Sequence, residues 1–375
     1  EPAAFPAVED IAFDAWAVSD VAGEFSGTDG QGTYTIGSIQ MRDVENQRAA
    51  FAELTGITFD VVDEDDMAFT GGLDSMTVAG ADLSFLSAMQ ENSGDQDGMM
   101  AALMGVAMNN PMEPGYDRFS LDNLSFEGEG MSFAMPSMDA YVERNNDGQP
   151  VRYVVEPLSM TLDADPDGGE VGQGLSQGLS MVGYESIELR AASISNYDPE
   201  ADILDFEAAD NYFELVDGAR FSYGGEFIGY ADFNQQLMAS MDMENLAEGQ
   251  DPDPMVVQQA LGALEIGKFE LRITDDSLVD RVFNAIATQQ GQDPEQMRTQ
   301  VVQMMGMAPL MAPQVGIDPA IASEVGVALA SFLQDPKTLT IMVAPEEPIS
   351  MESIAAMEDP SMITKDYLGF SATNE

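Results

Sequence analysis

Apolar and polar residues alternate with a period of two along the chain up to about Gly249, a pattern typical of antiparallel strands that bury one face. The clearest alternation runs from Phe119 to Met160. Within it, Asp147 and Gly148 match a two-residue hairpin turn, which would bring Glu143 opposite Arg152. We therefore expect a hairpin here, with an ion pair across its two strands.

Neighbouring segments show the same alternation. Trp16 to Ile39 predicts a first hairpin, with its turn within Gly27 to Gly32. The apolar residues of Asp43 to Leu54 recur at mixed helical spacing, so a short surface helix is expected there. The glycine-rich stretch from Gly168 to Gly183 predicts a mobile connection. The strand groups repeat loosely, without a fixed period.

The pattern changes near Gly249, where Gly249 to Pro254 combines glycine, acid and proline and predicts a linker. Further on, Asp293 precedes Pro294 and Asp318 precedes Pro319, the arrangement of an N-cap followed by proline in the first helical position. We therefore expect two parts, a β-rich repeat-like body over residues 1–249 and an α+β C-terminal section over residues 250–375.

The predicted fold class is α+β and mostly antiparallel β. We expect an elongated curved sheet built from loose strand repeats with short helices, followed by a smaller helix-rich C-terminal section. A chain of 375 residues, 45% of them apolar, is long enough to build a packed core.

The chain is strongly acidic, with 67 acidic against 13 basic residues and a formal net charge of -54. Such a surface repels nucleic acid and anionic lipid headgroups, so we expect no nucleic-acid partner. Dense acid with only three lysines is typical of proteins in salty surroundings, where screening weakens self-repulsion.

The chain contains no cysteine and no histidine, which excludes disulfides, thiolate metal sites and histidine-based triads. It begins at Glu1 without a methionine, as a mature chain does after signal-peptide removal, so we expect a periplasmic or secreted protein. We expect no transmembrane segment, since the most apolar stretch, Val301 to Ile317, is short and contains Pro309 and Pro313.

Candidate chemistry is sparse. Asp163, Asp165 and Asp167 match the opening of a calcium loop, but Gly174 stands where a bidentate glutamate would complete it, so calcium is only a weak expectation and no other cofactor is expected. With 67 acids, pairs of carboxylates at catalytic spacing carry no signal. We find no catalytic motif and expect a protein that is not an enzyme.

Methionine is the most unusual feature, with 27 residues, several at apolar strand positions. A loosely packed core accounts for them, and so does an apolar groove that accepts a lipid or another amphiphile. The apolar runs Met99 to Met108 and Val301 to Ile317 could cover such a groove. The groove candidates are Met76, Phe85, Leu124, Phe126, Met131, Phe133, Met135 and Met160.

Some segments resemble a known family. Phe119 to Leu124, Phe126 to Met135 and Tyr184 to Ile194 are similar to the strand repeats of AsmA-like envelope proteins and related exported proteins of Gram-negative bacteria. The section from Leu264 to Leu368 is similar to the tail of uncharacterised exported alphaproteobacterial proteins. The resemblance implies an exported, β-rich body with a lipid-handling groove, although the membrane anchor of the AsmA-like family is absent from this sequence.

Three functions stay open. The first is an exported binding protein with a methionine-rich groove for a lipid or amphiphile. The second is an acidic cell-surface structural or assembly protein that associates through strand edges or bridging cations. The third is a carboxylate-dependent hydrolase, which requires two acids with shifted pKa values in one cleft.

Overall fold

The computed structural model describes residues 11–27, 30–63, 67–84, 112–240, 254–312, 316–357 and 362–375. The chain forms two compact units, one from Glu1–Leu158 with Ala231–Ala260 and the other from Ser159–Tyr230 with Leu261–Glu375. All fifteen described strands belong to one sheet, and every strand pair whose register is resolved is antiparallel. The predicted fold class is confirmed: mostly antiparallel β, with short helices and a C-terminal part that contains several helices.

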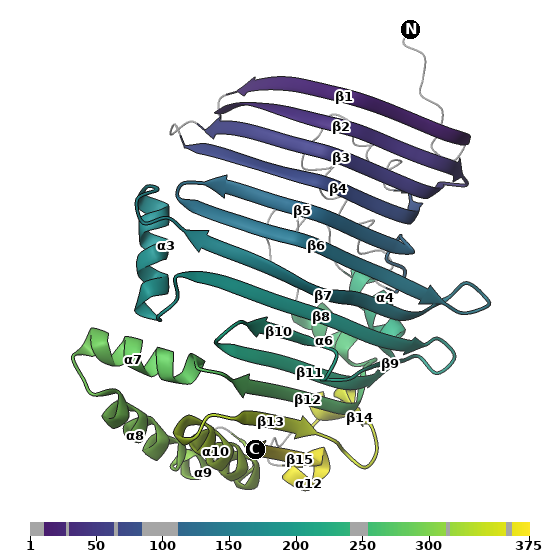
Figure 1. Ribbon diagram of the computed structural model, residues 1–375. Helices are drawn as coiled ribbons and strands as arrows, with labels where there is room; N and C mark the ends of the chain where they lie inside the picture. The colour runs from purple at the N-terminus through teal and green to yellow at the C-terminus, as the bar shows by residue number, and fades with distance from the viewer. Residues whose placement is uncertain are drawn as a thin grey trace. The chain divides into compact units, whose positions relative to one another are not determined.

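The first unit contains strands that pair in the order of the chain (Figure 1). Each of β1 to β5 pairs with the next through 10 to 13 residue pairs. These elements are β1 (Phe13–Gly27), β2 (Gly30–Glu45), β3 (Arg48–Asp63), β4 (Ala68–Asp82), β5 (Arg118–Gly128), β6 (Met131–Arg144), the start of β7 (Pro150–Ala164), and helix α4 (Tyr230–Ser240).

Two lines of interrupted pairing cross this unit, and they are its most regular feature. Each strand from β1 to β4 has two positions, six residues apart, at which the pairing skips a residue, and β5 has one such position, Asn123, six residues after Asp117, which directly precedes the strand. Counted along the register, these positions face one another from strand to strand. The first interruption contains Asp20, Gly37, Gly56, Asp74 and Asn123, with Pro136 of β6 facing Asn123, and the second interruption contains Asp14, Asp43, Ala50, Gly80 and Asp117.

In each of the five strands, the later interruption position, or the single one in β5, has a left-handed backbone. The φ angles are 56° at Asp20, 50° at Asp43, 61° at Gly56, 64° at Gly80 and 51° at Asn123. Glycine adopts this conformation without a Cβ penalty, and aspartate and asparagine tolerate it better than other residues do. The residue types at these sites therefore fit the backbone that the fold requires.

The interruptions keep the apolar side chains on one face. An extra residue in a strand would normally turn all later side chains to the opposite face. Here Met41 lies on one side of the second interruption and Val44 on the other, three residues apart, and both pack into one cluster. Ala52 with Ala49 and Val78 with Ala81 show the same three-residue step into that cluster.

The interruptions also reveal a repeat. Gly56 follows Asp20 by 36 residues, and Gly80 follows Asp43 by 37 residues. Successive β-hairpins therefore share one pattern, which supports the expected repeat architecture and gives it a period within β1 to β4.

One predicted hairpin turn is confirmed, and a second is one residue longer than predicted. Gly27 pairs with Gly30 at the end of the first hairpin. In the hairpin after β6, Asn145 N–H donates to Gln149 O over 2.9 Å and Gly148 N–H donates to Asn145 O, so three residues form the turn and the predicted two-residue turn is wrong by one. The expected ion pair is confirmed, with Arg152 Nη1 3.2 Å from Glu143 Oε1.

Two predicted elements are wrong. Asp43–Leu54 is not a helix: it covers the end of β2, a turn at Asn46 and Gln47 with φ angles of 52° and 59°, and the start of β3. The glycine-rich stretch Gly168–Gly183 is not a simple connection, because Glu170–Met181 forms helix α3 with Gly172 and Leu179 buried. The predicted linker Gly249–Pro254 lies outside the described residues except for Pro254, which begins helix α6 (Pro254–Leu261).

The second unit continues the antiparallel pairing with shorter strands. Its path runs β8–β10–β11–β12–β13–β15, while β9 pairs with β8 and β11, and β14 pairs with β12. The strands are β8 (Ser186–Asp198), β9 (Ile203–Phe206), β10 (Tyr212–Leu215), β11 (Ala219–Ile228), β12 (Glu265–Asp275), β13 (Thr338–Val343), β14 (Ile349–Ser350) and β15 (Phe370–Asn374). Besides α3, its helices are α7 (Leu278–Gln290), α8 (Pro294–Met305), α9 (Ala308–Met311), α10 (Pro319–Gln334), α11 (Met351–Ala355) and α12 (Lys365–Leu368).

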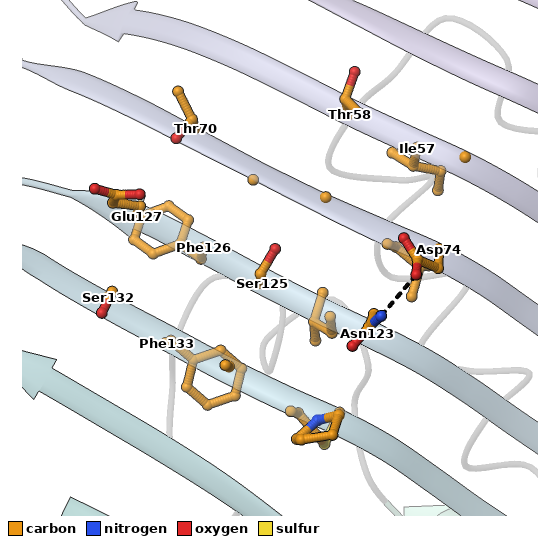
Figure 2. Close-up of a pocket in the computed structure, with 18 residues that line it drawn as sticks. Ile57, Thr58, Thr70, Asp74, Asn123, Ser125, Phe126, Glu127, Ser132 and Phe133 are labelled. Carbon is orange, nitrogen blue, oxygen red and sulfur yellow. Dashed lines mark hydrogen bonds between the residues drawn. The ribbon is translucent and has the colours of Figure 1, made fainter.

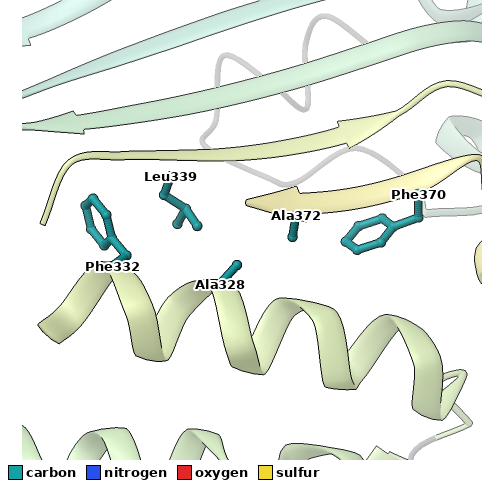
Figure 3. Close-up of a cluster of buried hydrophobic side chains, with 5 residues drawn as sticks. All are labelled: Ala328, Phe332, Leu339, Phe370 and Ala372. Atoms are coloured by element: carbon teal, nitrogen blue, oxygen red, sulfur yellow. The ribbon is translucent and has the colours of Figure 1, made fainter. Parts of the chain in front are cut away.

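One buried apolar cluster of the second unit lies between α10 and the strands β13 and β15 (Figure 3). Ala328 and Phe332 of α10 pack there against Leu339, Phe370 and Ala372. Both predicted aspartate–proline helix starts are confirmed. Asp293 accepts a hydrogen bond from Gln296 N–H at the start of α8, and Asp318 accepts one from Ala320 N–H at the start of α10. Within the part of the chain that the structure describes, no helix combines the length and apolar character needed to cross a bilayer.

Candidate functional site

One face of β1 to β6 in the first unit is lined by apolar side chains. The register aligns its side chains in rows across the strands, for example Leu54 beside Met76 and Met76 beside Leu121. We call this surface the apolar face. It consists of Trp16, Val18, Val21, Phe25, Tyr34, Ile36, Ile39, Met41, Ala52, Leu54, Ile57, Phe59, Val61, Phe69, Leu73, Met76, Val78, Phe119, Leu121, Leu124, Phe126, Met131, Phe133, Met135 and Met138.

Six of the eight groove candidates belong to the apolar face. Leu124 pairs with Met135 and Phe126 with Phe133, while Met131 pairs with Gly128 at the end of the same strands. Met76 lies across the first interruption, on the same side by the three-residue step described above. Of the other two candidates, Met160 of β7 falls in the second unit, and Phe85 lies outside the described residues. Whether these residues hold a ligand stays a prediction.

Aromatic rings on the apolar face lie over glycines of the adjacent strand. A Cβ built on Gly71 would meet the ring of Phe59 at 2.3 Å, and one on Gly128 would meet Phe69 at 2.3 Å. The ring of Tyr34 covers Gly23 in the same way. Glycine thus gives each ring room to lie along the sheet, where it presents its flat side outward.

The apolar face is only partly covered. Trp16, Phe25 and Tyr34 are 44%, 45% and 39% exposed, although residues of these types are normally buried. Of the seven groove candidates that the structure describes, Met135 is buried and the other six are half-buried. Phe126 packs between two other rings, 5.7 Å from Phe69 and 6.5 Å from Phe59 between ring centroids. Two apolar runs were predicted to cover the groove. Met99–Met108 lies outside the described residues. The described part of Val301–Ile317 belongs to α8, α9 and the residues beside them.

A cavity of about 600 Å³ lies on β3 to β6 (Figure 2). Four chain segments line it, and every segment begins and ends with a residue that belongs to the opposite face or to the first interruption, such as Thr58, Thr70, Glu127 and Ser132. Every apolar-face residue in the cavity lining has a neighbour of the polar face or of the first interruption on each side along the chain. Phe59, which is central on the apolar face, does not line the cavity. The order of these residues indicates that the cavity opens on the polar face, and Leu124, Phe126, Phe133 and Met135 are also among the residues that line it.

The polar face around this cavity carries hydroxyl groups that bond across the strands. Thr35 Oγ1 lies 2.7 Å from Thr58 Oγ1, and Ser75 Oγ donates to Asp122 Oδ2 over 2.7 Å. At the first interruption, Asn123 Nδ2 donates to Asp74 Oδ2 over 2.7 Å, the bond drawn in Figure 2. These groups bond one another across the strands and so stabilise the strand pairing, and the cavity lining combines hydroxyl groups with the carboxylates of Asp74 and Glu127.

The suggested calcium loop has an internal explanation. Asp165 follows the end of β7, and its carboxylate accepts a hydrogen bond from Asp167 N–H over 2.9 Å, which forms a tight turn. Asp163 is exposed. Among the described residues, no group of three or more carboxylates converges on a point where a cation could bind.

The carboxylates with shifted pKa values also have structural partners. Burial raises the pKa of Asp275, which accepts a hydrogen bond from Val279 N–H at the start of α7. Hydrogen bonds from the backbone N–H groups of Ala320 and Lys365 lower the pKa of Asp318. The side-chain hydrogen bond from Lys365 lowers the pKa of Glu324. All three belong to the second unit, and none of them lines the cavity.

Comparison with known proteins adds little about function. A family model described as "Uncharacterized protein" matches residues 212–375, from β10 to the end of the chain. A search of curated proteins found no match. The matched region lies mostly in the second unit, apart from Ala231–Ala260, and does not include β1 to β6. The resemblance to AsmA-like proteins thus stays a prediction.

Proposed function

We propose that the apolar face of the first unit binds an amphiphile with an acyl chain, as an exported, non-enzymatic binding protein would. The observation that supports this is the wide set of aligned apolar rows, in which Trp16, Phe25 and Tyr34 remain substantially exposed. Contiguous apolar surface of this extent is rare on a protein with no partner for it. Flat rings and flexible methionines suit a chain that has no fixed shape.

Charge narrows the kind of amphiphile. The net charge of -54 disfavours phosphatidylglycerol, free fatty acids and other anionic headgroups. A zwitterionic or cationic headgroup avoids that repulsion. We therefore propose a ligand of the lysophosphatidylcholine type rather than an anionic lipid.

Trp16 provides the assay, because it is the only tryptophan and lies on the apolar face. Lysophosphatidylcholine with a nitroxide on its acyl chain should quench Trp16 fluorescence in a saturable way below its micelle concentration. The unlabelled lipid should reverse the quenching, and lysophosphatidylglycerol should compete much less well. An absence of saturable quenching would contradict the proposal.

A matched pair of variants locates the binding surface. Phe126→Ser removes a ring whose burial against a ligand is worth about 1.5–3 kcal/mol, so the Kd for the lipid should rise by about ten-fold or more. Ser125→Ala changes the adjacent residue, whose side chain lies on the polar face, and should leave the Kd unchanged. Equal affinities for both variants would place binding elsewhere.

A further inference from the structure

We propose that the free edge of β1 pairs with β1 of a second copy of this chain, antiparallel and about a two-fold axis through Ala17. Within the described residues, β1 pairs with β2 alone, so the backbone N–H and C=O groups of about every second residue of this 15-residue strand point to its other edge. This inference concerns the edge of the sheet and does not rest on lipid binding by its face.

The edge lacks several of the features that usually prevent such pairing. Natural edge strands are protected by charged side chains, especially lysine, by proline, by short length or by a local bulge, and of these β1 has only the acidic charges of Asp14, Asp20 and Glu24 and its interruptions. β1 is long and contains no lysine, arginine or proline. Its left-handed residue, Asp20, is no special protection, because β3 and β5 have the same feature in the interior of the sheet.

The interruption pattern points to a copy of the same strand as the partner. A strand can pair along the whole of β1 only if it skips a residue opposite Asp14 and another opposite Asp20. β2 does so in the opposite direction, with its left-handed residue, Asp43, opposite Asp14. If Ala17 faces Ala17 of a second copy, then Asp20 of that copy faces Asp14, in the place that Asp43 takes on the other side.

The same register continues the apolar face. Trp16 would lie beside Val18 of the second copy, as it lies beside Met41 of β2. Phe13 would lie beside Val21 of the second copy, as it lies beside Val44 of β2. An ordinary extended peptide offers neither the two skipped residues nor this apolar match, so a second copy fits the edge better than an unrelated segment does.

Charge opposes this contact and makes it dependent on salt. Asp14 and Asp20 of opposite copies would face each other twice, between molecules that each carry a net charge of -54. Screening over a Debye length of about 3 Å in 1 M salt removes most of that repulsion, whereas about 10 Å in 0.1 M salt leaves much of it. Sedimentation should show the dimer fraction rising from low salt to about 1 M NaCl.

Cysteine substitution tests the register, because the natural chain has no cysteine. Ala17→Cys puts two thiols face to face on the axis, within the Cα separation of about 4.4–6.8 Å that a disulfide needs. It should form a disulfide dimer under mild oxidation in 1 M NaCl. Ser19→Cys is the control, since it is equally exposed but would face Ala15 of the second copy. A mixture of Ala15→Cys and Ser19→Cys should form the mixed dimer.

Equal cross-linking of Ala17→Cys and Ser19→Cys, or none of either, would overturn the proposal. A second pair avoids any dependence on thiol chemistry. Ala17→Glu sets two carboxylates against each other on the axis and should abolish the dimer at 1 M NaCl, while Ala15→Glu adds the same charge away from the axis and should weaken it less. A protein that sediments as a monomer at every salt concentration would also refute the inference.

Discussion

The left-handed residues of the two interruptions make a sharp prediction about glycine and alanine. Asp43 of β2 and Ala50 of β3 face each other across the second interruption, and both are exposed. Asp43 has a φ of 50°, whereas Ala50 is not among the residues with positive φ. Glycine should therefore be the better residue at position 43 and alanine the better residue at position 50.

The magnitude follows from two terms. A residue with a Cβ costs about 1–2 kcal/mol in the left-handed region. Glycine in place of alanine costs about 0.4–1 kcal/mol elsewhere, chiefly because the unfolded chain gains freedom. This second term is common to both positions. The preference for glycine over alanine should therefore differ between positions 43 and 50 by about 1–2 kcal/mol, with the unfolded-state term cancelled.

The assay is urea unfolding of Asp43→Gly, Asp43→Ala and Ala50→Gly together with the parent chain. Trp16 of β1 pairs with Met41 of β2, so the single tryptophan reports on the unit that contains both sites. Midpoints should change at constant slope, which shows that stability rather than compactness has changed. If glycine and alanine rank in the same order at both positions, the interruptions do not have the geometry described, and the argument from β1 to a second copy fails with them.

Three further predictions concern packing and charge. Phe332→Ala should destabilise the second unit by about 3–5 kcal/mol through loss of its central ring, and Phe332→Leu by clearly less, as measured by thermal unfolding followed by circular dichroism. Glu324→Gln should weaken the link of α10 to Lys365 and to Ala372 N–H. Because the folded pKa of Glu324 lies below its ordinary value of 4.5, this loss should be full above that pH and vanish as the pH falls through the folded pKa, so stability of parent and variant should converge in acid. Gly71→Val should push the ring of Phe59 off the sheet and destabilise the first unit, and the added change Phe59→Ala should recover part of the loss in the same urea assay.

The strands could be predicted because alternation survives the interruptions everywhere except at the interrupted residues. The false helix at Asp43–Leu54 shows the limit. Each interruption turns the two-residue apolar step into a step of three, as from Met41 to Val44 and from Ala49 to Ala52, and a three-residue step is also the spacing of a helix face. Periodicity alone cannot separate these cases. The turn residues Asn46 and Gln47 carried no glycine or proline to mark the hairpin.

The prediction of a mobile connection where helix α3 lies was wrong for a related reason. Its glycines predicted a mobile connection, yet Gly174 and Gly178 stand where a Cβ would contact nothing within 4 Å, while Leu179 is buried. An amphipathic helix tolerates glycine at about 1 kcal/mol per residue when its other face packs well. The sequence contains the apolar residues of this face, but they were not recognised because the glycines were interpreted as helix breakers.

The candidate site, too, could be predicted from the sequence only in part. The apolar residues of the hairpins could be found from alternation, which placed six of the eight candidates on one face of one unit. The cavity on the polar face could not, because it depends on small residues such as Gly72 and Ala134 aligned across separate strands. Only the register between strands brings them together, and register follows from pairing that no single strand encodes.

The strands β1 to β4 each have two interrupted positions six residues apart, the later of which is left-handed, and this has a consequence for how the sheet ends. Since each strand can pair with a reversed copy of the same pattern on either side, the register by itself gives no reason to stop at β1. The first strand carries the complete pattern in Asp14 and Asp20 and no basic residue or proline to block addition. The acidic charge is then what limits the addition of further strands at β1, because it repels a second molecule, and salt weakens this repulsion. The free edge of β1 should therefore pair most strongly with a second copy at high ionic strength, where salt screens the acidic charge.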